Sequence, residues 1–512
     1  MTLAVYPALL VALFLVWRYV RKGKAAGSLP PGPPGDPIIG HLRTLPRENY
    51  GEKYYEWSKI YGDVFSINIL GRPIIILNTV QAASDLFDKR SSTYNDRPYF
   101  PMQDLMGWGD TLAFLPFGEK FQLQRKLIQT PLTRPGAAMF RGQQVIQARI
   151  MMSKLLKNPK HFEHIAMRYA TAIIIEMAYG HRVVSDDDVY VEIAEGINKT
   201  ITDAGTPGMT PVDVFPILRH VPAWFPGAWF AKVARDAVPV VTKFRNFPFQ
   251  EVQRQMAEGT ATASFLSMHL EELARQGKES PEDINAIKVA AFHLFGAGGD
   301  TTFSAILTFI FAMLNYPEIQ KKAQKEIDDV IGNDRLPDFS DRESLPYVDA
   351  VMWETIRWHQ AGPIGMPRRA MQDEIYNGML IPKGAMVISN MRALTWDENV
   401  YAEPHKFWPE RYLPKPVGNA EPPPTMIFGH GRRICPGRYL AEASLWIVAT
   451  HLLTTFNVTR ARDAQGREIV PPVEFTSALT THPKPFECDI KPRSEKAASL
   501  IRTAVHGEGL EA

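Results

Sequence analysis

One segment of the chain surrounds a rare cysteine with glycine and positive charge. Cys435 lies in FGHGRRICPG, residues 428–437, and is one of only two cysteines in 512 residues. The stretch that follows, YLAEASLWIVATHLL, has the pattern of an amphipathic helix, so the cysteine comes just before a helix N-terminus. The positive end of a helix and neighbouring arginines both favour thiolate over thiol. The segment therefore predicts a cysteine with a chemical role.

Three kinds of site could use such a thiolate. A zinc site needs several Cys and His ligands at characteristic spacing, and the surroundings of Cys435 do not supply them. A nucleophilic cysteine needs a base, and His430 is close in sequence only. A haem iron needs one axial thiolate, flexible backbone beside it, and arginines for the haem carboxylates. The segment meets the requirements of haem.

A second segment, AGGDTT at residues 297–302, lies within a long apolar helical pattern. Two glycines in a helix cost about 1 kcal/mol each relative to alanine, and they allow something bulky and flat to approach the backbone. Asp300 and Thr301 follow in a stretch fit for burial, and a buried carboxylate with a hydroxyl suits proton delivery. The alternative is a helix crossing whose polar pair is satisfied by capping or water.

Two further motifs supply charge. ETIR places Glu354 and Arg357 at i and i+3 on one helix face, where they can pair. FWPERY, residues 407–412, adds Arg411 in a proline-bearing turn. Together the three could form a buried ion network, whereas the ETIR pair taken alone resembles an ordinary surface pair.

The N-terminus predicts a membrane anchor. Residues 1–17 carry no charged side chain, and four basic residues follow by residue 24. About 20 apolar residues make roughly 30 Å of helix, enough for a bilayer core. A cleaved signal peptide is the alternative, but its positive charge would precede the apolar run. We therefore expect a transmembrane helix at residues 1–20, with the bulk of the chain in the cytosol.

The rest of the chain predicts one large unit. Residues 21–40 form a basic and proline-rich hinge, which includes SLPPGPPGDP, and no later linker or repeat divides residues 41–512. Helical periodicity dominates residues 80–330, with strand candidates at 63–79, 374–391 and 474–490. The expected fold is mainly α with small β-sheets.

Composition excludes some classes of protein. A net charge of +2 with 22% charged residues argues against nucleic acid as the main partner. Hydrophobic residues at 45% suffice for a large core or for a core with an apolar cavity. Two cysteines far apart, the second being Cys488, form no disulfide framework and indicate a reducing compartment.

One apolar segment interrupts the helical region. Residues 213–230, DVFPILRHVPAWFPGAWF, are aromatic and broken by prolines. The segment could be a loop tucked onto the core, or it could dip into a membrane beside a substrate entrance.

The motifs together resemble the cytochrome P-450 family. FGHGRRICPG is similar to the family's cysteine-loop signature FxxGxRxCxG, AGGDTT to its oxygen-activation motif, ETIR to its ExxR motif and FWPERY to the arginine-bearing partner of that motif. All four occur in the expected order, and the resemblance covers essentially the whole chain. It implies the cytochrome P-450 fold. The residues that match the cysteine signature are Phe428, Gly431, Arg433, Cys435 and Gly437.

The resemblance also implies roles for individual residues. Cys435 would be the axial ligand of haem b (iron protoporphyrin IX), with Phe428 packed beside the ligand loop. Asp300 and Thr301 would relay protons, while Ala297 and Gly298 leave room for oxygen and substrate. Residues with other roles would be the structural ion triad Glu354, Arg357 and Arg411, and the haem-propionate donors Arg433, Arg368 and Arg125.

One departure from the family pattern concerns those donors. Many relatives carry a Trp-Arg pair in GEKFQLQRK, residues 118–126, where this chain has Phe121 and Gln122. Two expected propionate donors are missing, so haem could be held less tightly or its potential shifted.

The implied activity is monooxygenation. The chain would oxidise an apolar small molecule with O2 and with electrons from NADPH, passed on by NADPH–cytochrome P-450 reductase at the endoplasmic reticulum membrane. No GxGxxG occurs, which favours an external reductase. Alternatives are a haem-thiolate peroxygenase, an isomerising or dehydrating relative, and a non-catalytic haem-binding protein.

The substrate is suggested by analogy alone. LMGWGD at 105–110 and VPAWFPGAWF at 221–230 resemble fungal secondary-metabolism members of the family, including O-methylsterigmatocystin oxidoreductase-like enzymes and tryptamine hydroxylases. A terpenoid or polyketide-type scaffold is the preferred class. We expect pocket residues at 97–116, 205–225, 292–297 and 361–366.

Overall fold

The computed structural model describes residues 27–46, 48–183, 185, 188–277 and 279–506. The predicted anchor, residues 1–20, and the first residues of the predicted hinge lie outside this part of the chain.

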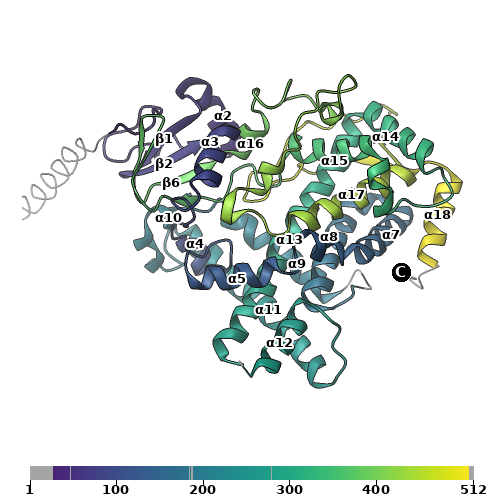
Figure 1. Ribbon diagram of the computed structural model, residues 1–512, viewed down its shortest axis with the longest axis horizontal. Coiled ribbons are helices and arrows are strands. Elements are labelled where there is room, and N and C mark those ends of the chain that lie inside the picture. The colour runs from purple at the N-terminus through teal and green to yellow at the C-terminus, as the bar shows by residue number, and fades with distance from the viewer. Residues whose placement is uncertain (1–26, 47, 184, 186–187, 278, 507–512) are drawn as a thin grey trace, which may run out of the picture.

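Helices make up most of the described chain, and the fold is mainly α with small sheets, as expected (Figure 1). The shorter helical segments include the π-helical η2 (Asp85–Lys89) and the 3-10 helices η4 (Pro216–His220), η6 (Pro409–Tyr412), η7 (Thr425–Phe428) and η8 (Gly431–Arg433). The α-helices are α2 (Tyr50–Tyr61), α3 (Val80–Ser84), α4 (Pro101–Leu105), α5 (Glu119–Gln129), α6 (Arg134–Ala138), α7 (Arg141–Lys157), α8 (Phe162–Tyr179), α9 (Val189–Ala204), α10 (Pro211–Val214), α11 (Trp229–Ala257), α12 (Phe265–Gln276), α13 (Pro281–Asn315), α14 (Pro317–Val330), α15 (Pro346–Trp358), α16 (Met391–Thr395), α17 (Arg438–Thr455) and α18 (Glu495–His506).

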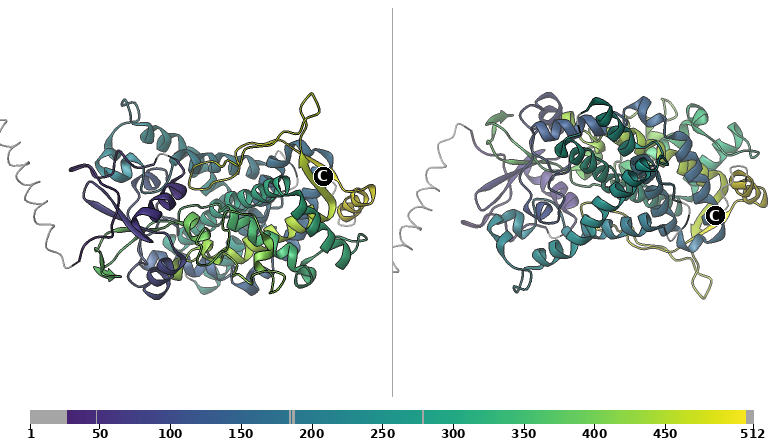
Figure 2. Two further views of the ribbon diagram at one scale, coloured as in Figure 1. Left: turned by 90° about the horizontal axis from the view of Figure 1, so that it is seen from above. Right: turned by 90° about the horizontal axis from the view of Figure 1, so that it is seen from below.

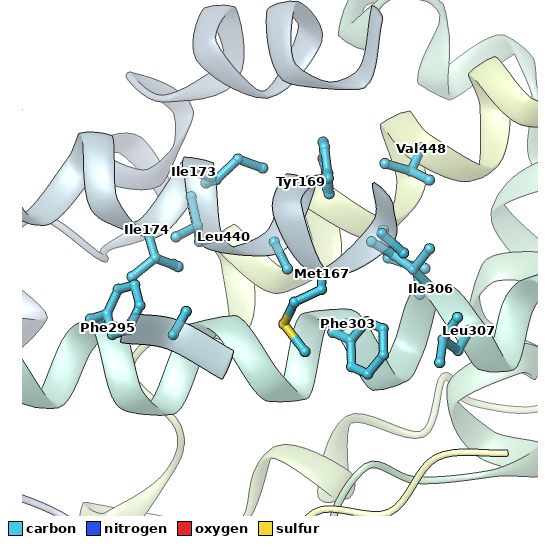
Figure 3. Packing of buried hydrophobic residues seen from close by; sticks show 14 of the residues in the cluster. Met167, Tyr169, Ile173, Ile174, Phe295, Phe303, Ile306, Leu307, Leu440 and Val448 are labelled. Atoms are coloured by element: carbon cyan, nitrogen blue, oxygen red, sulfur yellow. The ribbon is translucent and has the colours of Figure 1, made fainter. Parts of the chain in front are cut away.

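Helix α13, 35 residues long and mostly buried, is the central helix of the core. Its start is specified locally, because the Ser280 side chain accepts a hydrogen bond from the Asp283 amide and Pro281 occupies the first turn. Its end is set by Pro317, which cannot continue a helix. Helices α8 and α17 pack against it through aliphatic and aromatic side chains (Figure 3).

A small sheet joins the two halves of the chain. β1 (Val64–Ile69) and β2 (Arg72–Leu77) form the expected antiparallel hairpin, and β2 pairs in parallel with β6 (Met386–Ser389). β3 (Arg368–Arg369) completes the order β1-β2-β6-β3, and β4 (Glu374–Tyr376) pairs with β5 (Met379–Ile381). In both views of Figure 2 this purple sheet lies at the opposite end of the molecule from the yellow C-terminal helix.

The strand predicted at 474–490 begins further along the chain than expected. β8 covers Cys488–Pro492 and pairs with β7 (Phe456–Arg460). Residues 474–487 are a loop with one isolated bridge, because Pro483 and Pro485 lack the amide donors that a ladder needs. The loop is held on α13, since the Ser304 hydroxyl donates to the Thr481 carbonyl at 2.5 Å.

The described part of the proline-rich segment is packed on β1 and is not a free spacer. The Ser66 amide donates to the Pro31 carbonyl at 2.7 Å, and the His41 ring bonds the Pro33 carbonyl at 2.7 Å. A Cβ on Gly32 would lie 1.9 Å from the Ser66 carbonyl oxygen, so only glycine fits this approach.

Within the described residues, one helix is long and apolar enough to cross a membrane, and it is α13. Because 78% of its most apolar window is buried inside the protein, it serves as a core helix here.

Candidate active site

The cysteine loop is fixed by backbone bonds and by its contact with η2. The Cys435 amide donates to the Phe428 carbonyl at 2.7 Å. Gly431 has φ 53°, and a Cβ there would lie 2.2 Å from the Phe87 carbonyl oxygen. The Asp88 carboxylate accepts from the Gly431 amide at 2.6 Å and contacts the His430 ring at 2.9 Å. The loop can therefore adopt this shape only with glycine at 431.

The Cys435 thiol lines an internal cavity of about 450 Å³. Gly437 caps the start of α17, and the amides of Gly437 and Arg438 bond toward the sulfur. Burial nevertheless raises the pKa of the Cys435 thiol, and it outweighs these amides and the guanidinium of Arg125. The amides and the guanidinium act toward thiolate, as the sequence predicted, and a metal ion bound to the sulfur would favour the thiolate further.

Part of the cavity wall belongs to α13. Ala297, Gly298 and Thr301 line it, and the Thr301 hydroxyl donates to the Ala297 carbonyl at 2.9 Å. Asp300 does not line this wall, but its buried carboxyl lies beside the side chain of Thr480, which does. Burial raises the pKa of Asp300, which makes the carboxyl a better proton donor near neutral pH.

Gly298 lines the cavity and also packs closely against α8. A Cβ on Gly298 would lie 2.6 Å from the Ile174 side chain, so this glycine makes room for α8. Just before the motif, the Trp108 ring covers Gly296, where a Cβ would lie 2.6 Å from the ring.

Four arginine side chains border the same cavity: Arg97, Arg125, Arg368 and Arg433. Their hydrogen bonds go to backbone carbonyls, such as Arg97 to Met366 at 2.7 Å, and to the Gln129 side chain from Arg125. Among the residues that the structure describes, none of the four pairs with a carboxylate.

This cluster carries more positive charge than its surroundings balance. Burial and mutual repulsion lower the pKa of Arg97 and of Arg368 to about 9 and that of Arg433 to about 8. A flat ligand with two carboxylates would relieve this penalty, and a thiol facing the same cavity could ligate its metal. The donor set thus fits haem.

Sequence reasoning missed Arg97. The structure places it beside Arg368 and Arg433, where it supplies a cation in the region that lacks the Trp-Arg pair. Phe121 is buried under the Arg433 guanidinium, 3.6 Å from it, and Gln122 is exposed. The one sequence signal for Arg97 was its position at the edge of the predicted pocket segment 97–116.

The ion network lies away from the cavity and is fully buried. Arg357 donates to both carboxylate oxygens of Glu354, at 2.7 and 2.8 Å, and the Arg411 guanidinium lies 3.1 Å from that carboxylate. Glu421 pairs with the remaining face of Arg411 at 2.7 Å. The surface interpretation of the ETIR motif is therefore wrong, because Glu354 and Arg357 are each 0% exposed.

The cavity wall agrees only in part with the predicted pocket segments. Residues of 97–116, 292–297 and 361–366 line it, but none of 205–225 does. Helix α8 was not foreseen as a wall, because its apolar residues look like ordinary core in the sequence; Figure 3 shows Ile173 and Ile174 on it near Leu440. The wall residues that sequence reasoning missed include Ala170, Ile173, Ile174, Met177, Leu479 and Thr480.

Comparison with known proteins gives a consistent result. Residues 30–490 match the sequence profile of the family described as Cytochrome P-450. The chain is 43% identical to cytochrome P-450 monooxygenase 208 of Postia placenta, over 97% of this chain and 96% of that one. It is 39% identical to cytochrome P-450 monooxygenase claR of Ampulloclitocybe clavipes, over 96% and 91% of the two chains. The chain therefore belongs to the cytochrome P-450 family, as an oxidoreductase of the monooxygenase class.

Proposed function

We propose that this monooxygenase is anchored in the endoplasmic reticulum membrane and oxidises an apolar small molecule of fungal secondary metabolism. The preferred substrate class is a terpenoid or polyketide-type scaffold, with O2 as oxidant and electrons from NADPH through a reductase. One observation carries the proposal. A single cavity, walled mainly by apolar side chains, is lined by both Cys435 and Thr301.

In this proposal Cys435 ligates haem, and Arg97, Arg125, Arg368 and Arg433 hold its carboxylates. Haem bound through a thiolate supplies electron density that favours O–O cleavage. Thr301 lines the cavity, and the buried carboxyl of Asp300, next to it in sequence and beside Thr480, would supply the proton. The apolar side chains of α8 exclude water from the substrate.

The reductase would dock on the face outside the cysteine loop. A depression of about 630 Å³ there is lined by residues of α5 and of the loop, among them Lys126 and Arg432, which are both exposed. Lys120 lies on the same helix and is also exposed. Such a basic surface suits an acidic partner, by charge complementarity.

Membrane contact at 213–230 is supported by side-chain exposure. Trp224 is 79% exposed, Ile217 74% and Phe225 52%, which is unusual for large apolar groups outside an interface. Figure 1 shows α10, at the start of this segment, near the sheet end of the molecule, where the described chain begins. We propose that this segment and the N-terminal anchor bind the same membrane.

The ligand assignment is tested with carbon monoxide. The reduced, carbon monoxide-treated wild type should show the red-shifted Soret band of thiolate ligation, and Cys435→Ser should lose it. Cys488→Ser is the matched control, because Cys488 lies in β8 and does not line the cavity. A thiolate band retained by Cys435→Ser would show that the ligand is wrong.

The reaction is tested by reconstitution. With reductase, NADPH and isotopically labelled O2, one labelled oxygen atom should enter the product of an apolar substrate panel, as detected by mass spectrometry. Product formed with peroxide but never with reductase would instead favour a peroxygenase.

A further inference from the structure

One polar side chain in the cavity has no role in the chemistry described above. His293 lies on α13, four residues before Ala297 and eight before Thr301, and all three line the cavity. This spacing puts them on one face of the helix. His293 is 9% exposed. Its nitrogens make no hydrogen bond with any part of the chain that the structure describes.

Because His293 lines the cavity, a bound ligand could supply the hydrogen-bond partner that the described chain does not. Burial and the neighbouring Arg125 lower the pKa of His293 to about 4, so the ring is neutral at physiological pH. A neutral imidazole offers one donor and one acceptor. Gln103, on α4, is a second buried side chain on the cavity wall without a side-chain partner among the described residues.

We propose that His293 binds the substrate through a hydrogen bond to a hydroxyl or carbonyl oxygen, so that the substrate is an apolar scaffold that already carries oxygen. This inference rests on the proposed function and deepens it.

The helix geometry sets where that oxygen lies. Eight residues of α-helix span roughly 12 Å, so the bonded oxygen is held well away from the position next to Thr301. The oxidised carbon would therefore be several bonds from the existing oxygen. The apolar wall of α8 holds the scaffold between them.

Binding of two cage compounds tests the proposal without turnover. The probes are 1-adamantanol and adamantane, which share one rigid apolar body and differ in one hydroxyl. Their dissociation constants are measured by calorimetry and by the haem spin-state shift on the haem-loaded full chain. The variants are His293→Leu, which keeps bulk without hydrogen bonding, and His293→Gln, which keeps the hydrogen bond.

We expect His293→Leu to weaken alcohol binding about 5- to 10-fold, the effect of one net hydrogen bond, and to leave hydrocarbon binding within about twofold. His293→Gln should restore most of the alcohol affinity. An unchanged ratio of the two constants in His293→Leu overturns the proposal. If the ratio is unchanged and His293→Leu also loses haem, the proposal is overturned in the same way. His293 would then be assigned to the haem carboxylates.

The experiment distinguishes a failure of the His293 proposal from a failure of the proposed function. Calorimetry does not depend on the haem spectrum, so a chain without the thiolate Soret band would still report on His293.

Discussion

At the scale of single residues, the site consists of groups whose preferred charge state is opposed by burial. The Asp300 carboxyl, the Cys435 thiol and the cavity arginines all have pKa values shifted toward their neutral forms. Each pKa shift means that the charged form of the group costs free energy in the folded protein. Binding of a cofactor or of a proton can offset that cost.

Asp300→Asn is expected to stabilise the fold and slow the reaction. Because the folded-state pKa of Asp300 is raised, the folded form is penalised as pH rises above the unfolded pKa of about 4. Asparagine removes that penalty. The melting temperature of the variant should exceed that of the wild type at pH 7, with the gap closing toward pH 4, and kcat should fall about 100-fold.

Asp463→Asn is the control for the direction of the change in melting temperature. Hydrogen bonds from Arg467 and Gln465 lower the pKa of that partly exposed carboxylate, so its loss should not stabilise the protein at pH 7. Equal melting temperatures for Asp300→Asn and wild type at pH 7 would contradict the prediction.

Arg97→Leu is expected to loosen haem. The arginine is buried beside two other cations, so an anionic ligand gains from it directly. Transfer of haem to an acceptor protein should be about tenfold faster than from the wild type, roughly the effect of one buried charge-assisted bond. Arg432→Gln, at an exposed arginine off the cavity wall, should leave the transfer rate unchanged.

At the scale of elements, the contact between α8 and α13 defines the cavity. Ile174 occupies the space that Gly298 leaves, and Trp108 covers Gly296. Glycine on this helix therefore serves close packing at two positions. A Cβ on Gly299, by contrast, would have no neighbouring atom within 4 Å among the described residues.

Gly298→Ala and Gly299→Ala are therefore expected to act in opposite directions. The first forces Ile174 to move and should cost about 1–3 kcal/mol in unfolding free energy. The second adds a helix-favouring methyl group in open space and should gain up to about 1 kcal/mol.

Chemical denaturation of the two variants measures both values. Adding Ile174→Val to Gly298→Ala should recover part of the loss. Destabilisation by both alanines to the same extent would show that the glycines are needed for backbone flexibility instead.

At the scale of the whole molecule, the exposed apolar residues of 213–230 predict membrane affinity beyond the N-terminus. A chain lacking residues 1–26 should still bind phospholipid vesicles weakly in a sedimentation assay. Trp224→Ser with Phe225→Ser should reduce that binding about tenfold or more, because two exposed aromatic side chains lose their apolar contact.

The matched control replaces Met139 and Ile60 with serine, because these exposed apolar residues lie outside the segment. Vesicle binding that falls equally in both double variants would mean that 213–230 has no special role.

The sequence by itself determined the motifs, the helical class and the hairpin, because these depend on local spacing and periodicity. Cys435, Thr301 and Glu354 could each be singled out from a few neighbours. Which of them meet was decided only by tertiary structure. Arg97 and Thr480 join the site through long-range packing, and the wall at Ile174 has the sequence pattern of ordinary core. Burial, a property of the whole fold, decided that the Glu354 network is internal, and it raises the pKa of the Cys435 thiol.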